Sequence, residues 1–161
     1  MINLKVETYL KLVLAICFIS IISAYFIEYV LGHQPCNLCI IERIPYGLGI
    51  ILIFINLVFK KNEKFLIILL ILIFIFSLLI SFYHFGIEQS FFKESTVCSI
   101  GGATDIISKE ELIKQLNEKN ISCKDVTFKI FGLSLTSVNI IISFIIIILL
   151  FKIYRNHGKV R

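Results

Sequence analysis

The sequence predicts an all-α membrane protein, a four-transmembrane-helix bundle with one long outer loop that contains a short amphipathic helix. Of its 161 residues, 58% are hydrophobic, and the mean hydropathy is +0.93; ordinary soluble domains are only about 45–50% apolar. Four apolar runs, each about as long as the 20 residues that cross a bilayer, are separated by charged segments. A soluble domain of this size has too little interior for so much apolar surface, so we expect a bilayer to cover it.

The first span is predicted over residues 12–31, where Glu28 is the only charged residue. A helix rises about 1.5 Å per residue, so about 20 residues cross about 30 Å of hydrocarbon. The run is longer than the apolar part of a secretory signal peptide, and no small-residue cleavage site follows it. We therefore expect a retained span, followed by a short outer loop over residues 32–39.

The second span is predicted over residues 40–59, with Glu42 and Arg43 in its first turn and Pro45 just after them. Proline is tolerated at this point because the first turn of a helix does not use its N–H groups. The third span, residues 65–85, and the fourth, residues 133–151, consist mainly of Leu, Ile and Phe. Four spans form a single membrane domain over residues 1–161 and place both termini on one side.

Lysine and arginine residues gather on the side of the termini. Only Glu7 and Glu63 oppose them there. The nine basic residues on this side are Lys5, Lys11, Lys60, Lys61, Lys64, Lys152, Arg155, Lys159 and Arg161. By the positive-inside rule, the termini are cytoplasmic, and the loops over residues 32–39 and 86–132 are outside. The net charge of +5 does not indicate a nucleic-acid partner, because no basic face with interleaved aromatic residues is present.

Four of the five cysteines then lie on the oxidising side of the membrane, where disulfides persist. Cys17, inside the first span, is interpreted as a small buried hydrophobic residue. Cys98 and Cys123 lie in the long outer loop, and we expect them to form either a structural staple or a second redox pair. Between them, residues 108–111 match a capping box, which predicts a short amphipathic helix from Ser108 to about Lys119.

Cys36 and Cys39 form a CxxC pair, for which several interpretations stay open. A structural disulfide would close too short a loop to stabilise the chain much. A zinc site would need two further ligands, and Cys98 and Cys123 are not at the short spacing of a zinc ribbon. Chance spacing is the third interpretation, and a redox dithiol is the fourth.

Arg43 favours the redox interpretation of the CxxC pair. It is four residues beyond Cys39, so both are expected on one face where the second span begins. A helix N-terminus and a nearby guanidinium both lower the pKa of a thiol. The alternative is that Arg43 snorkels to the interface and pairs with Glu42 or with lipid phosphate.

Together these residues resemble the disulfide bond formation protein B (DsbB) family of bacterial inner membranes. The resemblance covers nearly the whole chain. It is carried by Pro35-Cys-Asn-Leu-Cys-Ile-Ile-Glu-Arg43, Tyr83-His-Phe-Gly-Ile-Glu88, Cys123, Phe131-Gly-Leu-Ser-Leu135 and Asn139. The chain departs from the family at Thr127-Phe128, where Pro-Trp is frequent, and at Val138, where Trp is frequent. These departures leave the cysteines and Arg43 in place.

The resemblance implies an inner-membrane enzyme that reoxidises a periplasmic DsbA-like thiol oxidase with a thioredoxin fold. The electrons would pass to membrane quinone, either ubiquinone or menaquinone. On this hypothesis the partner's thiolate attacks a Cys98–Cys123 disulfide at Cys98, and exchange with Cys36–Cys39 follows. Cys39 then delivers the electrons to the quinone as a thiolate, and Arg43 stabilises the negative charge that develops.

Three further residues are expected near the quinone, and no metal is expected. His84, at the end of the third span, would donate to a quinone oxygen or carry a proton; otherwise it is an interfacial histidine exposed to water. Gln34 and Glu42 would line the head-group site.

Three other functions remain open at this point. The first is a structural or assembly protein with two stabilising disulfides. The second is a metal-binding membrane protein. The third is an enzyme of the vitamin K epoxide reductase type, although that family carries its CxxC late in the chain, and here it is early.

Overall fold

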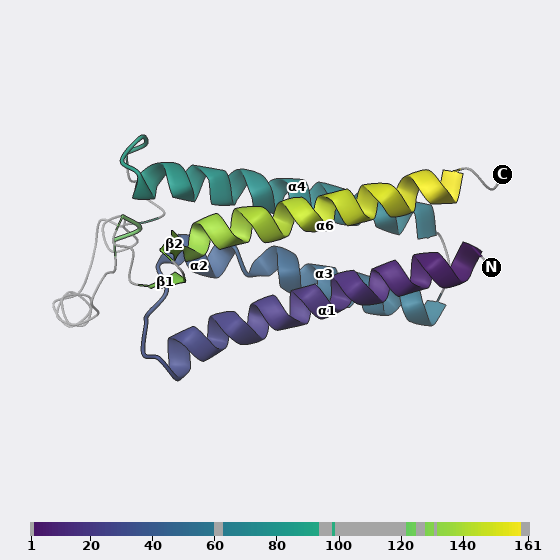
Figure 1. Ribbon diagram of the computed structural model, residues 1–161, viewed down its shortest axis with the longest axis horizontal. Helices are drawn as coiled ribbons and strands as arrows, with labels where there is room; N and C mark the ends of the chain where they lie inside the picture. Colours follow the sequence, from purple (N-terminus) through teal and green to yellow (C-terminus); the bar gives the residue numbers. More distant parts are fainter. Residues whose placement is uncertain are drawn as a thin grey trace, which may run out of the picture.

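The computed structural model describes residues 2–59, 63–93, 98, 122–124, 128–130 and 132–158. Its elements are α1 (Ile2–Tyr29), α2 (Asn37–Ile41), α3 (Ile44–Phe59), α4 (Glu63–Glu88), β1 (Lys129–Ile130), β2 (Leu133–Ser134) and α6 (Leu135–Gly158). The long helices form one bundle, in which α1 begins and α6 ends at the same end (Figure 1). The short helix α2 and both strands lie at the opposite end. The amphipathic helix predicted from Ser108 lies outside the described residues.

The described helices confirm the predicted four-span membrane protein. Four stretches are long and apolar enough to cross a bilayer: Val6–Tyr29, Asn37–Phe59, Glu63–Glu88 and Leu135–Arg155. Within their most apolar windows, only 17% to 33% of the residues are buried inside the protein. Large side chains such as Phe54, Phe76 and Phe144 point outward, as expected for faces that contact lipid rather than water.

The inner faces of the helices meet in one apolar core. Val6, Leu10, Val13 and Cys17 recur every three or four residues along α1, so they share one face of that helix. They pack against buried residues of the other three long helices: Tyr46, Ile53, Ile67, Leu70, Phe74, Ile146, Leu150 and Ile153. Cys17 is completely buried, which confirms its interpretation as a core residue.

The second span is divided into α2 and α3, although the sequence predicts one continuous helix. Pro45 has no N–H group with which to bond the carbonyl of Ile41, so the helical ladder is interrupted at this point. Glu42 still bonds through its N–H to the carbonyl of Leu38 at 2.9 Å, whereas Arg43 bonds to that of Ile40 at 3.1 Å. Glu42 and Arg43 therefore occupy the turn between two helices rather than the first turn of one.

A short hairpin leads into α6. Its strands are antiparallel, with Ile130 opposite Leu133, and Gly132 in the connecting turn has a φ of +84°, which favours glycine. The hydroxyl of Ser134 accepts a bond from the N–H of Ser137 at 3.3 Å and so caps α6. The helix consequently begins at Leu135, two residues after the predicted start of the fourth span.

Candidate functional site

The CxxC pair lies where α2 begins. Cys36 is the N-cap residue of this helix, and its Sγ accepts a hydrogen bond from the backbone N–H of Cys39 at 3.3 Å. Both cysteines are free thiols, and their sulfur atoms are 2.7 Å apart. The first turn of α2 therefore holds the two sulfurs side by side, in the arrangement that a redox dithiol requires.

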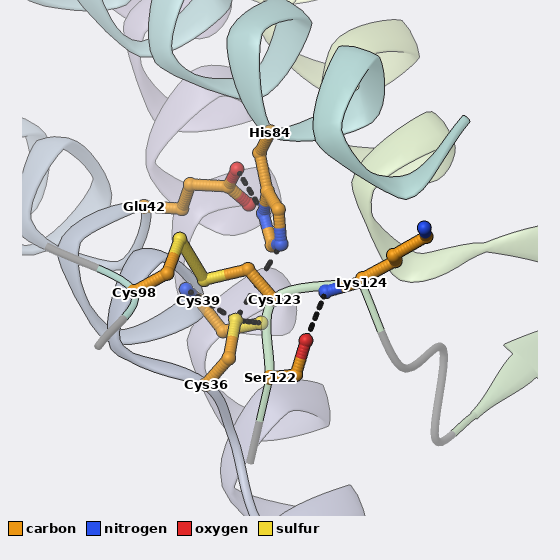
Figure 2. The surroundings of a disulfide bond; sticks show 8 residues. All are labelled: Cys36, Cys39, Glu42, His84, Cys98, Ser122, Cys123 and Lys124. Atoms are coloured by element: carbon orange, nitrogen blue, oxygen red, sulfur yellow. Dashed lines mark hydrogen bonds and ion pairs between the residues drawn. A yellow bond between two sulfur atoms is a disulfide. The ribbon is translucent and has the colours of Figure 1, made fainter. Parts of the chain in front are cut away.

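A disulfide between Cys98 and Cys123 packs against this pair. Figure 2 shows it beside Cys36 and Cys39, and Leu38 and Ile87 complete the small buried cluster. The pairing means that Cys98 and Cys123 cannot serve as thiolate ligands in this state, which removes the four-cysteine zinc site left open by the sequence. Two cysteine pairs that are far apart in the sequence thus meet at one end of the bundle.

His84 of α4 connects Cys36 to a buried carboxylate. The side chain of His84 is 2% exposed; its Nε2 lies 3.5 Å from Cys36 Sγ, and its Nδ1 lies 2.9 Å from Glu42 Oε1 (Figure 2). An ionised carboxylate only accepts hydrogen bonds, so Nδ1–H donates to Glu42 and the Nε2 atom faces the sulfur. The alternative of a water-exposed interfacial histidine is therefore wrong.

Glu42 belongs to a polar network that joins three of the helices. Its second oxygen accepts a hydrogen bond from Asn139 Nδ2 of α6 at 3.1 Å. The same amide donates to the Ser81 hydroxyl of α4 at 2.7 Å, and the Asn139 carbonyl oxygen accepts from the Tyr46 hydroxyl of α3. Glu42 is 7% exposed, so its charge is held by donors from the protein rather than by water.

The burial of His84 had a signal in the sequence that our prediction missed. Ser77, Ser81 and His84 follow one another at intervals of four and three residues in an otherwise apolar run. That spacing places all three on one face of a helix, and polar residues in a membrane span almost always face the bundle interior. All three are buried in the structure.

The donors around Cys36 determine which sulfur of the pair carries negative charge. The hydrogen bond from the Cys39 thiol is the main cause that lowers the pKa of Cys36, and His84 adds to it by its hydrogen bond and its charge. Burial is the second-largest effect and opposes the shift, but the donors together outweigh it. The hypothesis drawn from the sequence assigns the thiolate to Cys39, beside Arg43. In the structure, however, the groups that stabilise a thiolate surround Cys36.

Arg43 is held by two residues of α1. Its Nη1 donates to Glu28 Oε2, and its guanidinium carbon lies 5.0 Å from the centre of the Tyr25 ring, within the range of a cation–π contact. Its partner is therefore Glu28 and not Glu42, which our alternative interpretation of Arg43 had named. Glu28 is the only charge in the first apolar run, and a charge in a span is a signal that a partner lies nearby.

A cavity of about 260 Å³ opens beside Cys39. Its walls come from α1, from the segment that follows α1, from the α2–α3 turn and from the start of α6. The polar residues at its surface include Gln34, Glu42, Arg43, Tyr46 and Asn139, and most of the rest is apolar. Cys36 and His84 are not among the lining residues, so the structure brings three expected quinone-site residues and Cys39 together here but not His84.

Comparison with known proteins identifies the family. The model of the family described as disulfide bond formation protein DsbB matches residues 7–153. The chain belongs to the DsbB family. A protein of Rickettsia prowazekii (strain Madrid E), described as uncharacterized protein RP370, is 30% identical over 152 residues, which are 91% of this chain and 88% of the relative. No solved structure matches the chain.

Membership of the DsbB family agrees with the architecture of the site. The protein is a multi-pass membrane protein and a disulfide-generating oxidoreductase. The matched region includes all five cysteines, Arg43, His84 and both spans that flank the CxxC pair.

Proposed function

We propose that this DsbB-family protein reoxidises a periplasmic thiol oxidase of the DsbA type and passes the electrons to membrane quinone, as in DsbA–DsbB–quinone systems generally. The observation that carries the proposal is the sequence of contacts at one end of the bundle. A disulfide in the outer segment packs against the CxxC pair, and Cys39 of that pair lines an apolar cavity. Electrons entering at Cys98–Cys123 therefore have a route of adjacent sulfurs to the cavity.

The cavity suits a quinone head group of the ubiquinone or menaquinone class. Ligand sites of this kind are mostly apolar with a few placed polar groups, and here Arg43, Tyr46 and Gln34 are among the polar residues that supply those groups. The Arg43 guanidinium has further N–H donors besides the one that binds Glu28. A bound quinone would supply the acceptor for two electrons and two protons. Arg43 would hold a quinone oxygen and stabilise negative charge on it.

The thiol exchanges follow from the order of the two pairs. The partner's thiolate attacks the Cys98–Cys123 bond at Cys98, and the partner's second thiol resolves the mixed disulfide, which leaves Cys98 and Cys123 reduced. These thiols then reduce a Cys36–Cys39 disulfide by the same chemistry. Each exchange forms one S–S bond and breaks one, so two electrons and two protons move inward together.

The two cysteines of the CxxC pair have different roles in this proposal. Cys36, whose charged form is stabilised and which packs against the outer disulfide, exchanges with protein thiols. Cys39 faces the cavity and closes the disulfide with Cys36 as the electrons leave. His84 Nε2 accepts the proton of Cys36, and Glu42 holds the opposite ring nitrogen in its N–H form.

We place the protein in the bacterial inner membrane with both termini cytoplasmic. The nine basic residues on the side of the termini support this orientation. The CxxC pair, at the opposite end of the bundle, would then be periplasmic (Figure 1). The outer disulfide would thus be within reach of a periplasmic partner.

Anaerobic turnover of the purified protein tests the proposal. We expect one equivalent of ubiquinone or menaquinone to be reduced for each disulfide formed in a reduced thioredoxin-fold partner. Cys39→Ala removes the cavity-side sulfur and should abolish quinone reduction, whereas the matched control Cys17→Ala, which alters a buried core cysteine that does not line the cavity, should turn over normally. Quinone reduction by Cys39→Ala at the wild-type rate would overturn the proposal.

A further inference from the structure

We propose that the reduced Cys36–Cys39 pair, together with His84, binds a thiophilic divalent metal ion of the zinc class, and that the oxidised pair does not. The two Sγ atoms and a His84 ring nitrogen lie within 4.8 Å of one another. Along the sequence only Cys98 and Cys123 suggest themselves as further ligands, at a spacing that does not predict a metal site. The inference concerns only the reduced CxxC pair, so it does not depend on the identity of the electron acceptor.

The distances fit a tetrahedral ion after one small movement. With Zn–S bonds of about 2.3 Å and Zn–N bonds of about 2.0–2.1 Å, tetrahedral angles separate a sulfur from a nitrogen by about 3.6 Å and two sulfurs by about 3.8 Å. Cys36 Sγ and His84 Nε2 are already 3.5 Å apart. The sulfurs are 2.7 Å apart and must separate by about 1 Å, which a rotation of the half-buried Cys39 side chain can supply.

His84 is already oriented as a metal ligand. Its Nδ1–H donates to Glu42 at 2.9 Å, so Nε2 presents its lone pair towards the sulfurs. A histidine that ligates a metal almost always donates a hydrogen bond from the N–H of its other ring nitrogen, commonly to a carboxylate. This hydrogen bond fixes the tautomer and raises the basicity of the ligating nitrogen. Glu42 is itself held by Asn139, so the orientation is built into the bundle.

The site offers three protein ligands and an open fourth position. Cys98 and Cys123 are joined to each other in this structure, and the three ligands of the site do not change when a reductant also opens this disulfide. Cys39 lines the cavity, which gives an ion and a water molecule a path to the sulfurs. Three protein ligands with an open position are typical of accessible rather than purely structural zinc sites.

The chemistry makes the site dependent on redox state. Binding converts two thiols into two thiolates, releases two protons and transfers no electrons. Forming the Cys36–Cys39 disulfide removes two electrons and both thiolate ligands, so the ion must leave. A bound ion would in turn occupy both sulfurs and prevent Cys36 from attacking a disulfide.

Titration of the purified full-length protein with Co²⁺ and Zn²⁺ tests this site. We expect the protein reduced with a phosphine to bind one Co²⁺ with thiolate-to-metal charge-transfer absorption and tetrahedral ligand-field bands, and Zn²⁺ to displace it. The oxidised protein should show neither signal. A Cys98→Ser/Cys123→Ser variant should keep the full signal, because the outer pair supplies no ligand. Equal binding by reduced and oxidised protein, or loss of binding in that double variant, would overturn the proposal.

The role of His84 is tested separately. His84→Ala should weaken binding at least tenfold, Glu42→Gln should weaken it 10- to 100-fold through the hydrogen bond to the ligand, and the control His33→Ala should not weaken it. X-ray absorption at the zinc edge of the wild-type protein gives an answer that does not depend on the folding of any variant. Two sulfurs and at least one imidazole nitrogen are expected; a spectrum with sulfur ligands and no imidazole would contradict the assignment.

Discussion

Glu42→Gln is the substitution for which the structure makes the sharpest prediction. Each oxygen of Glu42 accepts one hydrogen bond, from His84 Nδ1 at 2.9 Å and from Asn139 Nδ2 at 3.1 Å. A glutamine has one acceptor oxygen and one NH₂ group, so it satisfies only one of these donors as they stand. If its oxygen faces His84, its NH₂ confronts the NH₂ of Asn139, and an unsatisfied buried donor costs about 1–3 kcal/mol.

The other orientation of the introduced glutamine avoids that cost but changes the histidine. The glutamine NH₂ then donates to Nδ1, the ring proton moves to Nε2, and Nε2 can no longer accept the proton of Cys36. A difference of about 1–3 kcal/mol favours this orientation by about 5- to 150-fold, so it should dominate. Loss of a positioned base costs about 10²- to 10⁴-fold in rate, and we expect a decrease of about 100-fold with little loss of stability.

Stopped-flow oxidation of a reduced partner at saturating quinone measures this rate, and thermal unfolding in detergent measures the stability. Glu88→Gln is the matched control, since Glu88 is a partly buried carboxylate at the end of α4. Its Oε1 accepts from Thr136, and its Oε2 has no partner among the described residues. A glutamine can keep the bond from Thr136, and although its buried NH₂ would cost about 1–3 kcal/mol of stability, turnover of the folded protein should persist. A Glu42→Gln protein that keeps its wild-type rate would refute the role assigned to His84.

Three other substitutions have defined outcomes. Arg43→His should raise the KM for quinone about tenfold or more, because it removes the cation that lines the cavity and its contacts with Glu28 and Tyr25; an unchanged KM would contradict this. Gly49→Val should destabilise the fold by about 1–3 kcal/mol in thermal unfolding, because a Cβ at Gly49 would lie 3.3 Å from the Phe74 ring. The turnover rate of each folded molecule should not change. Cys17→Ala should keep full turnover and lose about 1 kcal/mol of stability or somewhat more, since it removes one buried atom from the core; lost turnover in a folded protein would show that Cys17 takes part in the chemistry.

The spans were predictable because hydropathy and length are local properties of the chain. The residues that form a continuous Leu- and Ile-rich run in α4 need no distant partner to be recognised as a membrane helix. The break at Glu42 and Arg43 was missed, although Pro45 was visible, because a proline is compatible both with the first turn of one helix and with the start of a second. Only the backbone hydrogen bonds around Ile41, which the structure provides, distinguish a single helix from two.

Several candidate site residues are close together in the sequence, but their contacts could not be predicted from it. Cys36, Cys39 and Arg43 are close in the sequence, so their position at one end of a span could be inferred, although Arg43 lies in the turn beyond α2 and not on one helix with Cys39. The bonds of His84 to Cys36 and Glu42 span 48 and 42 residues, and they depend on how α4 is rotated against α2 and α3. Sequence spacing along one helix cannot determine the rotation of another, although the spacing of Ser77, Ser81 and His84 does show which face of α4 turns inward.

Disulfide mapping by mass spectrometry in the Cys39→Ala variant tests most directly whether the two cysteine pairs act in series. In this variant Cys36 cannot close its own disulfide, but its thiolate can attack the intact Cys98–Cys123 disulfide, which breaks one S–S bond and forms another. We predict that the purified, partner-free variant contains a bond between Cys36 and either Cys98 or Cys123, with the other outer cysteine left as a thiol. If instead Cys36 remains a free thiol beside an intact Cys98–Cys123 disulfide, the two pairs do not exchange, and the proposed route is wrong.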